Sequence, residues 1–483
     1  MNELFIAING FFNKILFFDI FFKQIEGVEF PFVVALLIVG GVYLTLKMGF
    51  VNLRMFSHSL AIVRGKYKTK DDKGVISPFQ SLATALSATV GIGNIAAVSI
   101  AISLGGAGAA FWMILAGFLG MTLKFTEVTL SLKYREFLPD GTIMGGGMEY
   151  LSRGLADKGM ATTGKIMAVV FAFFMILGAL GAGNTFQISQ SLSIMQGQIS
   201  FFNDFPWVFG LIMAFITGLV IIGGIKRIAH VAEKIVPLMV IFYLIMVFWV
   251  LAIYFTAIPD AFALIFHEAF SPTAVVGGIF GAMVQGFQRA VFSNEAGLGS
   301  AGIAHSASRV KYPIRQGLVS LYEPFIDTVV VCTMTALVVI LTGSYLGDTE
   351  VLDAAIAAKQ GAVITSTAFG SVVSWFPTVL GFAIFMFAFS TMISWAYYGE
   401  RAWVYIFGAK TSIVYKIIFL GFIIIATIVD TGTMVDFSSI LFLALAIPNI
   451  FGLLIMSGDV RKMLTEYMSK LKSGELDREA IKD

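Results

Sequence analysis

The sequence predicts an all-α integral membrane protein with about 11 transmembrane helices, and three observations support this. Of its 483 residues, 58% are hydrophobic and 13% are charged, whereas a soluble chain has about 25% charged residues. Many apolar runs reach the roughly 20 residues that a helix needs to cross a bilayer. They are too long and too uniformly apolar for the strands of a membrane barrel, so the spans are helices. Finally, the basic residues are concentrated in alternate loops.

Charge and cysteine content exclude several classes of protein. The net charge is only +2, from 32 basic and 30 acidic residues, which argues against nucleic acid as the main partner. The single cysteine, Cys332, excludes an intramolecular disulfide and any cysteine-based zinc or iron–sulfur site. Residues 159–165 resemble the start of a phosphate loop, but Ile166 replaces the required serine or threonine. We therefore expect no enzyme activity, no ATP-driven pump and no cofactor.

The first 77 residues precede the main body of spans. Residues 1–30 are rich in phenylalanine but interrupted by Lys14, Asp19 and Lys23. They lack a basic start and a small-residue cleavage site, so we expect a helix lying in the membrane interface and not a signal peptide. Residues 31–77 hold an extra first span and a basic loop, and a tail of residues 458–483 follows the last span.

The distribution of lysine and arginine predicts the orientation of the spans. The expected spans are 31–49, 78–104, 107–132, 166–196, 206–224, 234–257, 273–306, 316–343, 376–404, 412–429 and 434–456. Loops after odd-numbered spans are basic, as Arg54, Arg64 and Lys66 show for the first. Residues 197–205 and 258–272, which follow even-numbered spans, contain no lysine or arginine. Because basic loops stay in the cytoplasm, we expect the N-terminus outside and the C-terminus inside.

Two spans are interrupted in the same way. Residues 87–94 in the second span and 286–299 in the seventh combine glycine, asparagine and hydroxyl residues, which favour a break in a helix. Close helix packing through small residues is the alternative. Because the two spans lie five apart, they cross in opposite directions, which predicts inverted repeats over 78–257 and 258–457. Paired breaks of this kind indicate a transporter site, where freed amides suit a carboxylate and freed carbonyls suit a cation.

Four motifs resemble those of one transporter family. They are Gly91-Ile92-Gly93-Asn94-Ile95, residues 105–113, Lys124-Phe125-Thr126-Glu127 and residues 293–301. In this order they resemble the signatures of the alanine or glycine:cation symporter family, from about residue 30 to about 455. Ala107 and Ile114 depart from the family's usual proline and second tryptophan. The family is part of the amino acid–polyamine–organocation group, so the resemblance implies a five-plus-five, LeuT-like core in the plasma (inner) membrane of a bacterium or archaeon.

The resemblance also implies residues for a substrate site and a sodium site. Amides near Ile92 and Gly93 would hold a substrate carboxylate. A sodium ion would be bound by main-chain carbonyls in the second span and by hydroxyls in the ninth, namely Ser87, Val90, Ser390 and Thr391. Both hydroxyls have an alternative role, because serine and threonine in membranes often bond a carbonyl of their own helix. Thr89 and Asn94 match a second sodium site of the neurotransmitter:sodium symporters.

Other substrate-site candidates come from residues near the breaks. Asn94 belongs to the first break, and the mid-span amide of Asn184 must find a partner, either the substrate or another helix. Phe287 would cap the substrate side chain. Trp395, one turn beyond Thr391, would wall the pocket or serve as a packed aromatic residue.

Ionisable residues inside the spans are expensive and should be paired. Arg289 precedes the second break, and Asp327 lies deep in the eighth span. We expect Arg289 to neutralise Asp327 as a structural charge pair, with Glu323 and Glu295 as alternative partners. Lys124 and Glu127 lie three residues apart on one helix and form a second expected pair.

These observations predict a secondary transporter with a lipid bilayer, an amino acid and Na⁺ as its partners. We expect sodium-coupled import of a small neutral amino acid by alternating access. Alanine or glycine is the first substrate that the resemblance implies, and glutamine is the second. Sodium is favoured over protons because the second span offers no carboxylate near residues 91–94. Proton-coupled symport and a passive channel remain the alternatives.

Overall fold

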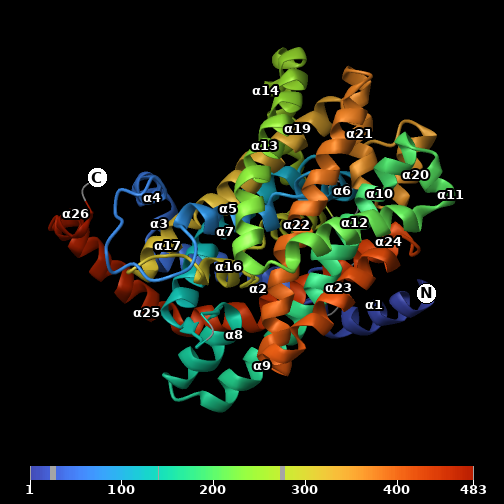
Figure 1. Ribbon diagram of the computed structural model, residues 1–483. Coiled ribbons are helices and arrows are strands. Elements are labelled where there is room, and N and C mark those ends of the chain that lie inside the picture. The colour runs from blue at the N-terminus through green and yellow to red at the C-terminus, as the bar shows by residue number, and fades with distance from the viewer. Residues whose placement is uncertain (1, 22–28, 140, 272–277, 482–483) are drawn as a thin grey trace.

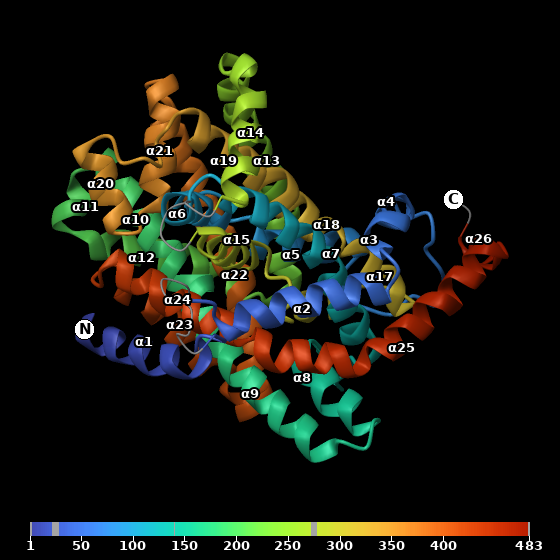
Figure 2. The same cartoon turned by 180° about the vertical axis from the view of Figure 1, so that it is seen from behind.

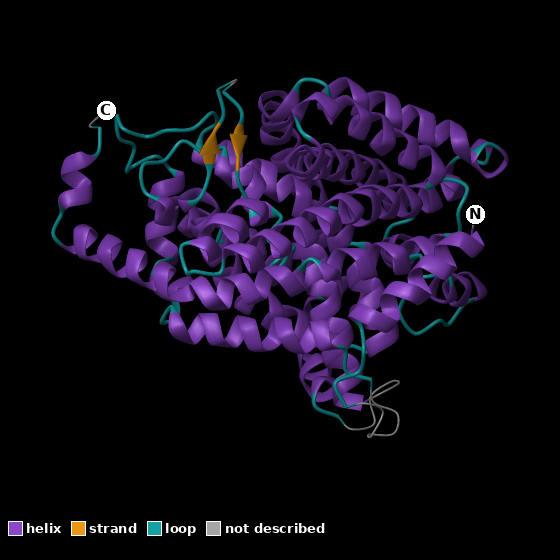
Figure 3. Ribbon diagram, turned by 90° about the horizontal axis from the view of Figure 1, so that it is seen from below, coloured by secondary structure: helices purple, strands orange, loops and turns teal. Residues whose placement is uncertain are grey.

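The computed structural model describes residues 2–21, 29–139, 141–271 and 278–481. Figure 3 shows that helices dominate the described chain. The strands in this part are β1 (Glu136–Phe137) and β2 (Ile143–Met144), which pair antiparallel. This arrangement agrees with the predicted fold class, because a chain surrounded by lipid must satisfy its backbone within helices or a closed barrel.

Four helices precede the predicted repeats: α1 (Asn2–Leu16), α2 (Phe32–Lys47), α3 (Val51–Arg54) and α4 (Phe56–Val63). Helix α2 coincides with the predicted extra first span, and it lies beside α25 in Figure 2. Helix α1 packs against α24 through Phe5 and Phe437, whose ring centroids are 4.9 Å apart. Its opposite side exposes Leu4 and Phe11, as expected for a helix that lies on the surface. Residues 22–28 of the predicted interfacial segment lie outside the described residues.

In the described residues, the predicted first repeat contains thirteen helical elements: α5 (Pro78–Thr89), η1 (Ile92–Asn94), α6 (Ala96–Gly105), α7 (Ala109–Lys133), α8 (Gly147–Glu149), η2 (Tyr150–Gly154), α9 (Ala161–Leu180), η3 (Gly181–Thr185), α10 (Phe186–Gln198), α11 (Phe201–Asp204), α12 (Pro206–Ile221), α13 (Gly224–Ile253) and η4 (Phe255–Ala257). Ser77 begins α5 with a capping box, in which its hydroxyl accepts from the Gln80 amide and the Gln80 side chain accepts from the Ser77 amide.

The predicted second repeat begins with α14 (Ile258–Ala269), α15 (Gly278–Asn294), α16 (Ala301–Ser306), α17 (Pro313–Val319), α18 (Tyr322–Pro324), η5 (Phe325–Cys332) and α19 (Thr333–Leu341). It continues with α20 (Glu350–Ala357), α21 (Gly361–Val372), α22 (Phe376–Phe407), η6 (Ala409–Thr411), α23 (Ser412–Ile425), α24 (Thr431–Ala444), α25 (Ala446–Lys472) and, in the tail, α26 (Glu475–Glu479). Figure 1 shows the ends of α13 and α14 projecting from the bundle.

Within the described residues, six helical runs are long and apolar enough to cross a membrane. A seventh is formed if the two halves of the second span, bent by 54° between Thr89 and Ile92, count as one. The other predicted spans coincide with the shorter helices α2, α12 and α23 and with the pair α15 and α16. Residues 273–277, where the seventh predicted span begins, lie outside the described residues. The connection at 344–375 was expected to be a loop, but it contains α20 and the buried helix α21, whose 12 residues are too short for a span.

The two interrupted spans lie side by side at the centre of the bundle. Helix α6 packs along α15, and η1 also contacts α15. Helix α22 runs past α5 and η1 on another side. Every residue from Ser81 to Ala101 is buried, so the first break is enclosed by protein on all sides. This arrangement places the breaks together, with α22 beside them.

Candidate functional site

The second span is broken where the sequence predicts, and the asparagine side chain holds the break open. The Gly91 amide donates to Asn94 Oδ1 at 2.8 Å, and the Asn94 amide donates to the Gly91 carbonyl at 3.2 Å. In a continuous α-helix these amides would bond the carbonyls of Ser87 and Val90, four residues earlier. Both carbonyls therefore lose their helical partners inside a buried segment.

The break also frees two amides. Neither the Ile92 nor the Gly93 amide donates a hydrogen bond to another residue that the structure describes. These groups lie at the start of the second half-span, where unpaired amides favour a negative group. Gly93 lies against α15, because a Cβ on it would come 3.2 Å from the Ser293 Cα. The two broken spans therefore meet at Gly93.

The seventh span is also interrupted, immediately after α15. Glu295 adopts a left-handed conformation with φ of 59°, and the chain turns through Gly297 and Gly299 before α16 begins. Positive φ is uncommon for a residue with a side chain and marks local strain. The Glu295 carboxylate accepts a hydrogen bond from Trp395 Nε1 at 2.8 Å and another from the Ser300 hydroxyl. These bonds hold Glu295 at the break and connect it to α22.

A cavity of only about 10 Å³ lies between the two breaks, so its walls nearly touch. Its walls are Ala88, Thr89, Gly91, Gly93, Ala182, Gln187, Phe292, Glu295, Thr391, Trp395 and Phe442. Two of its buried polar atoms, Thr391 Oγ1 and Gln187 Oε1, have no hydrogen-bond partner in the described part of the chain. Buried polar atoms are nearly always paired, so these two oxygens make the cavity a candidate place for a polar ligand.

The predicted sodium ligands lie together, but the two hydroxyls differ. The Ser87 hydroxyl donates to the Ser390 carbonyl at 2.7 Å, which joins α5 to α22. The Ser390 hydroxyl donates to the Phe387 carbonyl of its own helix at 3.0 Å, as the alternative interpretation expected. Thr391 Oγ1 has no such bond and faces the break, 2.4 Å from where a Cβ on Gly91 would lie. Carbonyl and hydroxyl oxygens of this kind suit a hard cation.

Two predicted substrate residues do not line the cavity. Asn184 donates from Nδ2 to the Phe419 carbonyl on α23 at 2.7 Å, so its amide forms the helix–helix bond. It belongs to the π-helical turn η3, which shifts the helix register and directs Ala182 and Gln187 to the cavity instead. Phe287 lies nearly two turns before the break and packs near Trp112, with ring centroids 6.4 Å apart. The structure brings Gly93 and Trp395 to the cavity wall and places Ile92 and Asn94 next to it.

The predicted charge pair between Arg289 and Asp327 does not form. Arg289 donates from Nη1 to the Ser439 hydroxyl on α24 at 3.0 Å and lies over the Phe292 ring. The Asp327 carboxylate instead accepts from neutral donors, at 2.6 Å from Asn94 Nδ2, 3.2 Å from the Ser293 hydroxyl and 2.7 Å from the Thr328 hydroxyl. These donors satisfy the carboxylate without a basic side chain.

The second expected pair is also wrong. Lys124 lies 3.1 Å from Glu323 Oε2 on α18, and both side chains are fully buried. Glu127, on the same helix as Lys124, accepts from Asn449 Nδ2 at 2.9 Å. Asn449 also donates to the Gly297 carbonyl at 2.8 Å. Lys124 therefore neutralises a glutamate, Glu323, of another span. Glu127 helps to hold the second break through Asn449.

The contact between Asp327 and Asn94 bears on the coupling ion. The second span contains no carboxylate near residues 91–94. The structure nevertheless brings the Asp327 carboxylate, from η5 in the eighth span, to the Asn94 side chain that holds the first break. The lack of a carboxylate in the second span therefore does not by itself favour sodium over protons.

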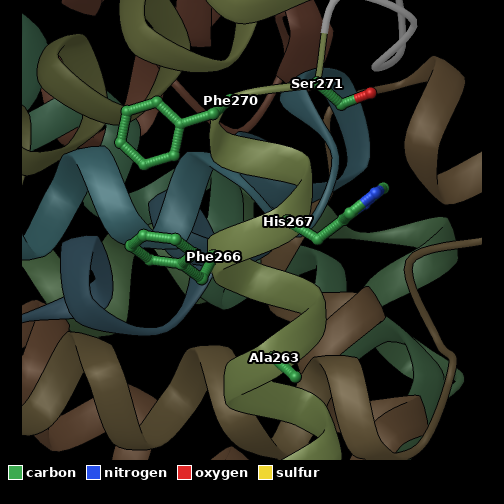
Figure 4. A pocket seen from close by; sticks show the side chains of 5 residues that line it. All are labelled: Ala263, Phe266, His267, Phe270 and Ser271. Atoms are coloured by element: carbon green, nitrogen blue, oxygen red, sulfur yellow. The ribbon is translucent and has the colours of Figure 1, made fainter.

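Sequence reasoning also missed several cavity residues. Gln187 follows the glycine-rich stretch around Asn184, and Glu295 flanks the second break, so both stood near a visible signal. No motif in the sequence marked Phe442 on α24 as a cavity residue. A separate pocket is lined by Ala263, Phe266 and His267 of α14 and by Phe270 and Ser271 just after it, as Figure 4 shows. It includes no residue of either break.

Comparison with known proteins agrees with this geometry. Residues 16–481 match the model of the sodium:alanine symporter family. The chain belongs to this family. It is 39% identical over 433 residues to the sodium/alanine symporter AgcS of Methanococcus maripaludis, covering 89% of this chain and 92% of that protein. The probable sodium/glutamine symporter GlnT of Bacillus subtilis is 32% identical, with coverage of 92% and 89%.

A solved structure supports the fold assignment. The crystal structure of MhsT in complex with L-phenylalanine aligns with a TM-score of 0.54 at 15% identity, covering 81% of this chain and 99% of that one. The fold is therefore the predicted LeuT-like, all-α membrane fold. This member of the sodium:alanine symporter family is a multi-pass, cation-coupled amino acid symporter and not an enzyme.

Proposed function

We propose that this symporter imports a small neutral amino acid together with Na⁺ by alternating access. Alanine or glycine is the first substrate and glutamine the second. The observation that carries the proposal is the first break, where buried main-chain groups without helical partners face the unpartnered Thr391 hydroxyl. In the proposed orientation the N-terminus lies outside a bacterial or archaeal plasma membrane and the C-terminus in the cytoplasm.

The cavity offers a partner for each part of an amino acid. The amides of Ile92 and Gly93 suit the substrate carboxylate. Glu295 and the unpartnered Gln187 Oε1 provide acceptors for its ammonium group. Aromatic rings close the space left for the side chain. The volume of about 10 Å³ is far below the roughly 300–1,000 Å³ of most ligand pockets, so an amino acid enters only when the surrounding helices move apart, as alternating access requires.

Na⁺ is the proposed coupling ion at the adjoining oxygen cluster. The carbonyls of Ser87 and Val90 lack their helical partners, and Thr391 supplies the free hydroxyl. Ser390 belongs to the same cluster, although its hydroxyl already has a carbonyl partner. The ion and the substrate would bind to consecutive residues of one break, so each would help to order the site for the other.

Uptake into proteoliposomes tests this proposal. Labelled alanine, glycine and glutamine are offered with an inward Na⁺ gradient, with a K⁺ gradient as control. We expect Na⁺-dependent accumulation of at least one of them. Thr391→Ala should raise the Na⁺ concentration for half-maximal uptake, whereas Thr391→Ser, which keeps the hydroxyl, should stay near the parent. An unchanged Na⁺ dependence in Thr391→Ala would remove Thr391 from the ion site.

Proton coupling is the second candidate, because the Asp327 carboxylate lies 2.6 Å from Asn94 Nδ2 with no basic group among its hydrogen-bond partners. A buried carboxylate of this kind can carry a proton across a transport cycle. A proton gradient without Na⁺ would then drive uptake, and Asp327→Asn would abolish this uptake. If only a Na⁺ gradient drives accumulation, the proton-coupled candidate is rejected.

A further inference from the structure

A chain of buried ionisable side chains lies beside the second half of the seventh span. Lys124 on α7, Glu323 on α18 and His305 on α16 are all fully buried. Lys124 Nζ is 3.1 Å from Glu323 Oε2, and His305 Nε2 bonds the other oxygen of the same carboxylate. Ionisable groups inside a membrane protein are costly and mark function by default. None of the three lines the cavity between the breaks.

The hydrogen-bond network assigns the protonation of His305. The Ser308 hydroxyl donates to Gln316 Oε1 at 2.8 Å, so the amide nitrogen of Gln316 faces His305. The Gln316 Nε2 donates to His305 Nδ1 at 2.6 Å. Nδ1 of the histidine is then an acceptor, and the ring proton lies on the Nε2 of His305. In this arrangement Nε2 of His305 donates to Glu323. The charge of Glu323 is balanced by Lys124.

His305 fixes α16 to its neighbours at one point. The ring joins α16 to α18, and the Ser81 hydroxyl of α5 donates to the adjacent Ala304 carbonyl at 3.1 Å. Helices α5 and α16 are the halves of the two broken spans that lie at the end with the basic loops, which is the cytoplasmic end in the proposed orientation. Ser300, immediately before α16, bonds the cavity residue Glu295. The position of α16 is thus coupled to the cavity.

We propose that His305 is a positioning residue that acts as a releasable latch on α16. When α16 moves away, the bond from His305 to Glu323 breaks, but Glu323 keeps Lys124 as its ion pair. The movement also breaks the bonds of Gln316 to His305, of Ser81 to the Ala304 carbonyl and of Arg135 Nη1 to the Ser306 carbonyl at 2.9 Å. It leaves Glu323 paired with Lys124, whereas a cationic side chain at 305 would separate two charges. The latch holds the cytoplasmic half of the seventh span in its closed position. This inference rests on the alternating access of the proposed function.

Cysteine labelling tests the latch without any transport substrate. The parent carries Cys332→Ser, which removes the only cysteine, and Ser306→Cys, at a buried position on α16. Inside-out vesicles in Na⁺ are treated with a membrane-impermeant maleimide. We expect His305→Ala to raise the labelling rate at position 306 by ~10-fold, the equilibrium shift for losing a hydrogen bond to a charged group. His305→Gln, whose amide nitrogen takes the place of Nε2, should stay near the parent.

Two further variants keep the test decisive. His305→Asn retains a polar group near Nδ1 but is too short to reach Glu323, so it should label like His305→Ala even if the alanine variant folds poorly. His230→Ala, whose side chain on α13 is 61% exposed, is the matched control and should not change labelling. Variants that raise the labelling rate should also raise the Na⁺ concentration for half-maximal uptake, in the same order.

The outcomes separate the latch from a purely structural role. Labelling that is unchanged in folded His305→Ala, with only a lower melting temperature, overturns the latch. Equal labelling of the glutamine and alanine variants also overturns it, because the donor at Nε2 would then have no effect. If labelling follows the expected order but no tested amino acid is taken up, the latch stands and the substrate assignment fails.

Discussion

Replacing Gly91 by alanine tests the proposed contact between the first break and the ion site. The φ of Gly91 is −143°, which any residue can adopt, so glycine is required here for space and not for conformation. An added Cβ would lie 2.4 Å from Thr391 Oγ1, about 0.6 Å closer than the 3.0 Å below which real contacts do not occur. Overpacking of this kind costs about 1–3 kcal/mol.

A double mutant identifies the atom responsible. The next contacts of the added Cβ, with Thr391 Cβ at 3.6 Å and Gln187 Oε1 at 3.7 Å, are ordinary. Adding Thr391→Ala to Gly91→Ala should therefore recover most of the stability, with an interaction energy of about 1–3 kcal/mol. Na⁺-dependent uptake should stay impaired, because the hydroxyl is gone.

The assay is thermal unfolding of detergent-purified protein, followed by uptake in proteoliposomes. Gly178→Ala is the matched control, since its added Cβ would come no closer than 3.4 Å to Leu445 on α24–α25. If Gly91→Ala is as stable as the control, or if Thr391→Ala fails to restore the double mutant, the contact does not exist as the structure shows it.

Three further predictions concern other contacts. Trp395→Phe removes the indole donor from the buried Glu295 carboxylate, so it should destabilise the protein by about 1–3 kcal/mol. It should also raise the substrate concentration for half-maximal uptake. An unchanged melting temperature and unchanged uptake would contradict this prediction. Burial lowers the pKa of His58 from 6.5 to about 4. The unfolded chain therefore takes up this proton first, and melting temperatures should fall as pH drops from 6.5 toward 4, less steeply in His58→Gln. Glu479 lies 3.4 Å from Lys311 in a partly exposed pair. Glu479→Gln should therefore change the free energy of unfolding by less than about 1 kcal/mol. A larger loss of stability in thermal unfolding would show that the pair is more than a surface contact.

Local chemistry explains which parts of the site the sequence revealed. Gly91 and Asn94 predicted a break because glycine weakens a helix and an asparagine side chain competes for its amides, and the structure shows that bond at 2.8 Å. The position of Thr391 followed from the resemblance. Each of these signals lies within a few residues of the feature that it predicts.

The misplaced residues depended on how separate helices are rotated. The sequence of the fourth span contains no mark for the π-helical turn that directs Gln187 to the cavity and Asn184 to α23. The partner of Asp327 comes from another repeat and could not be inferred from spacing along the chain. Helix α21 was missed because a 12-residue apolar segment has no distinct signature between a loop and a span.

Charge balance around the two breaks gives a physical reason for ion coupling. Glu127, Glu295 and Asp327 are buried there, and the hydrogen bonds to their carboxylates come from neutral donors. The buried basic side chain of Lys124 is already paired with Glu323. A buried carboxylate without a counter-charge is costly. A zwitterionic amino acid brings no net charge and cannot offset this cost, whereas a cation can. In the proposed site, a substrate would therefore bind more favourably after a cation has entered, which would link the two fluxes.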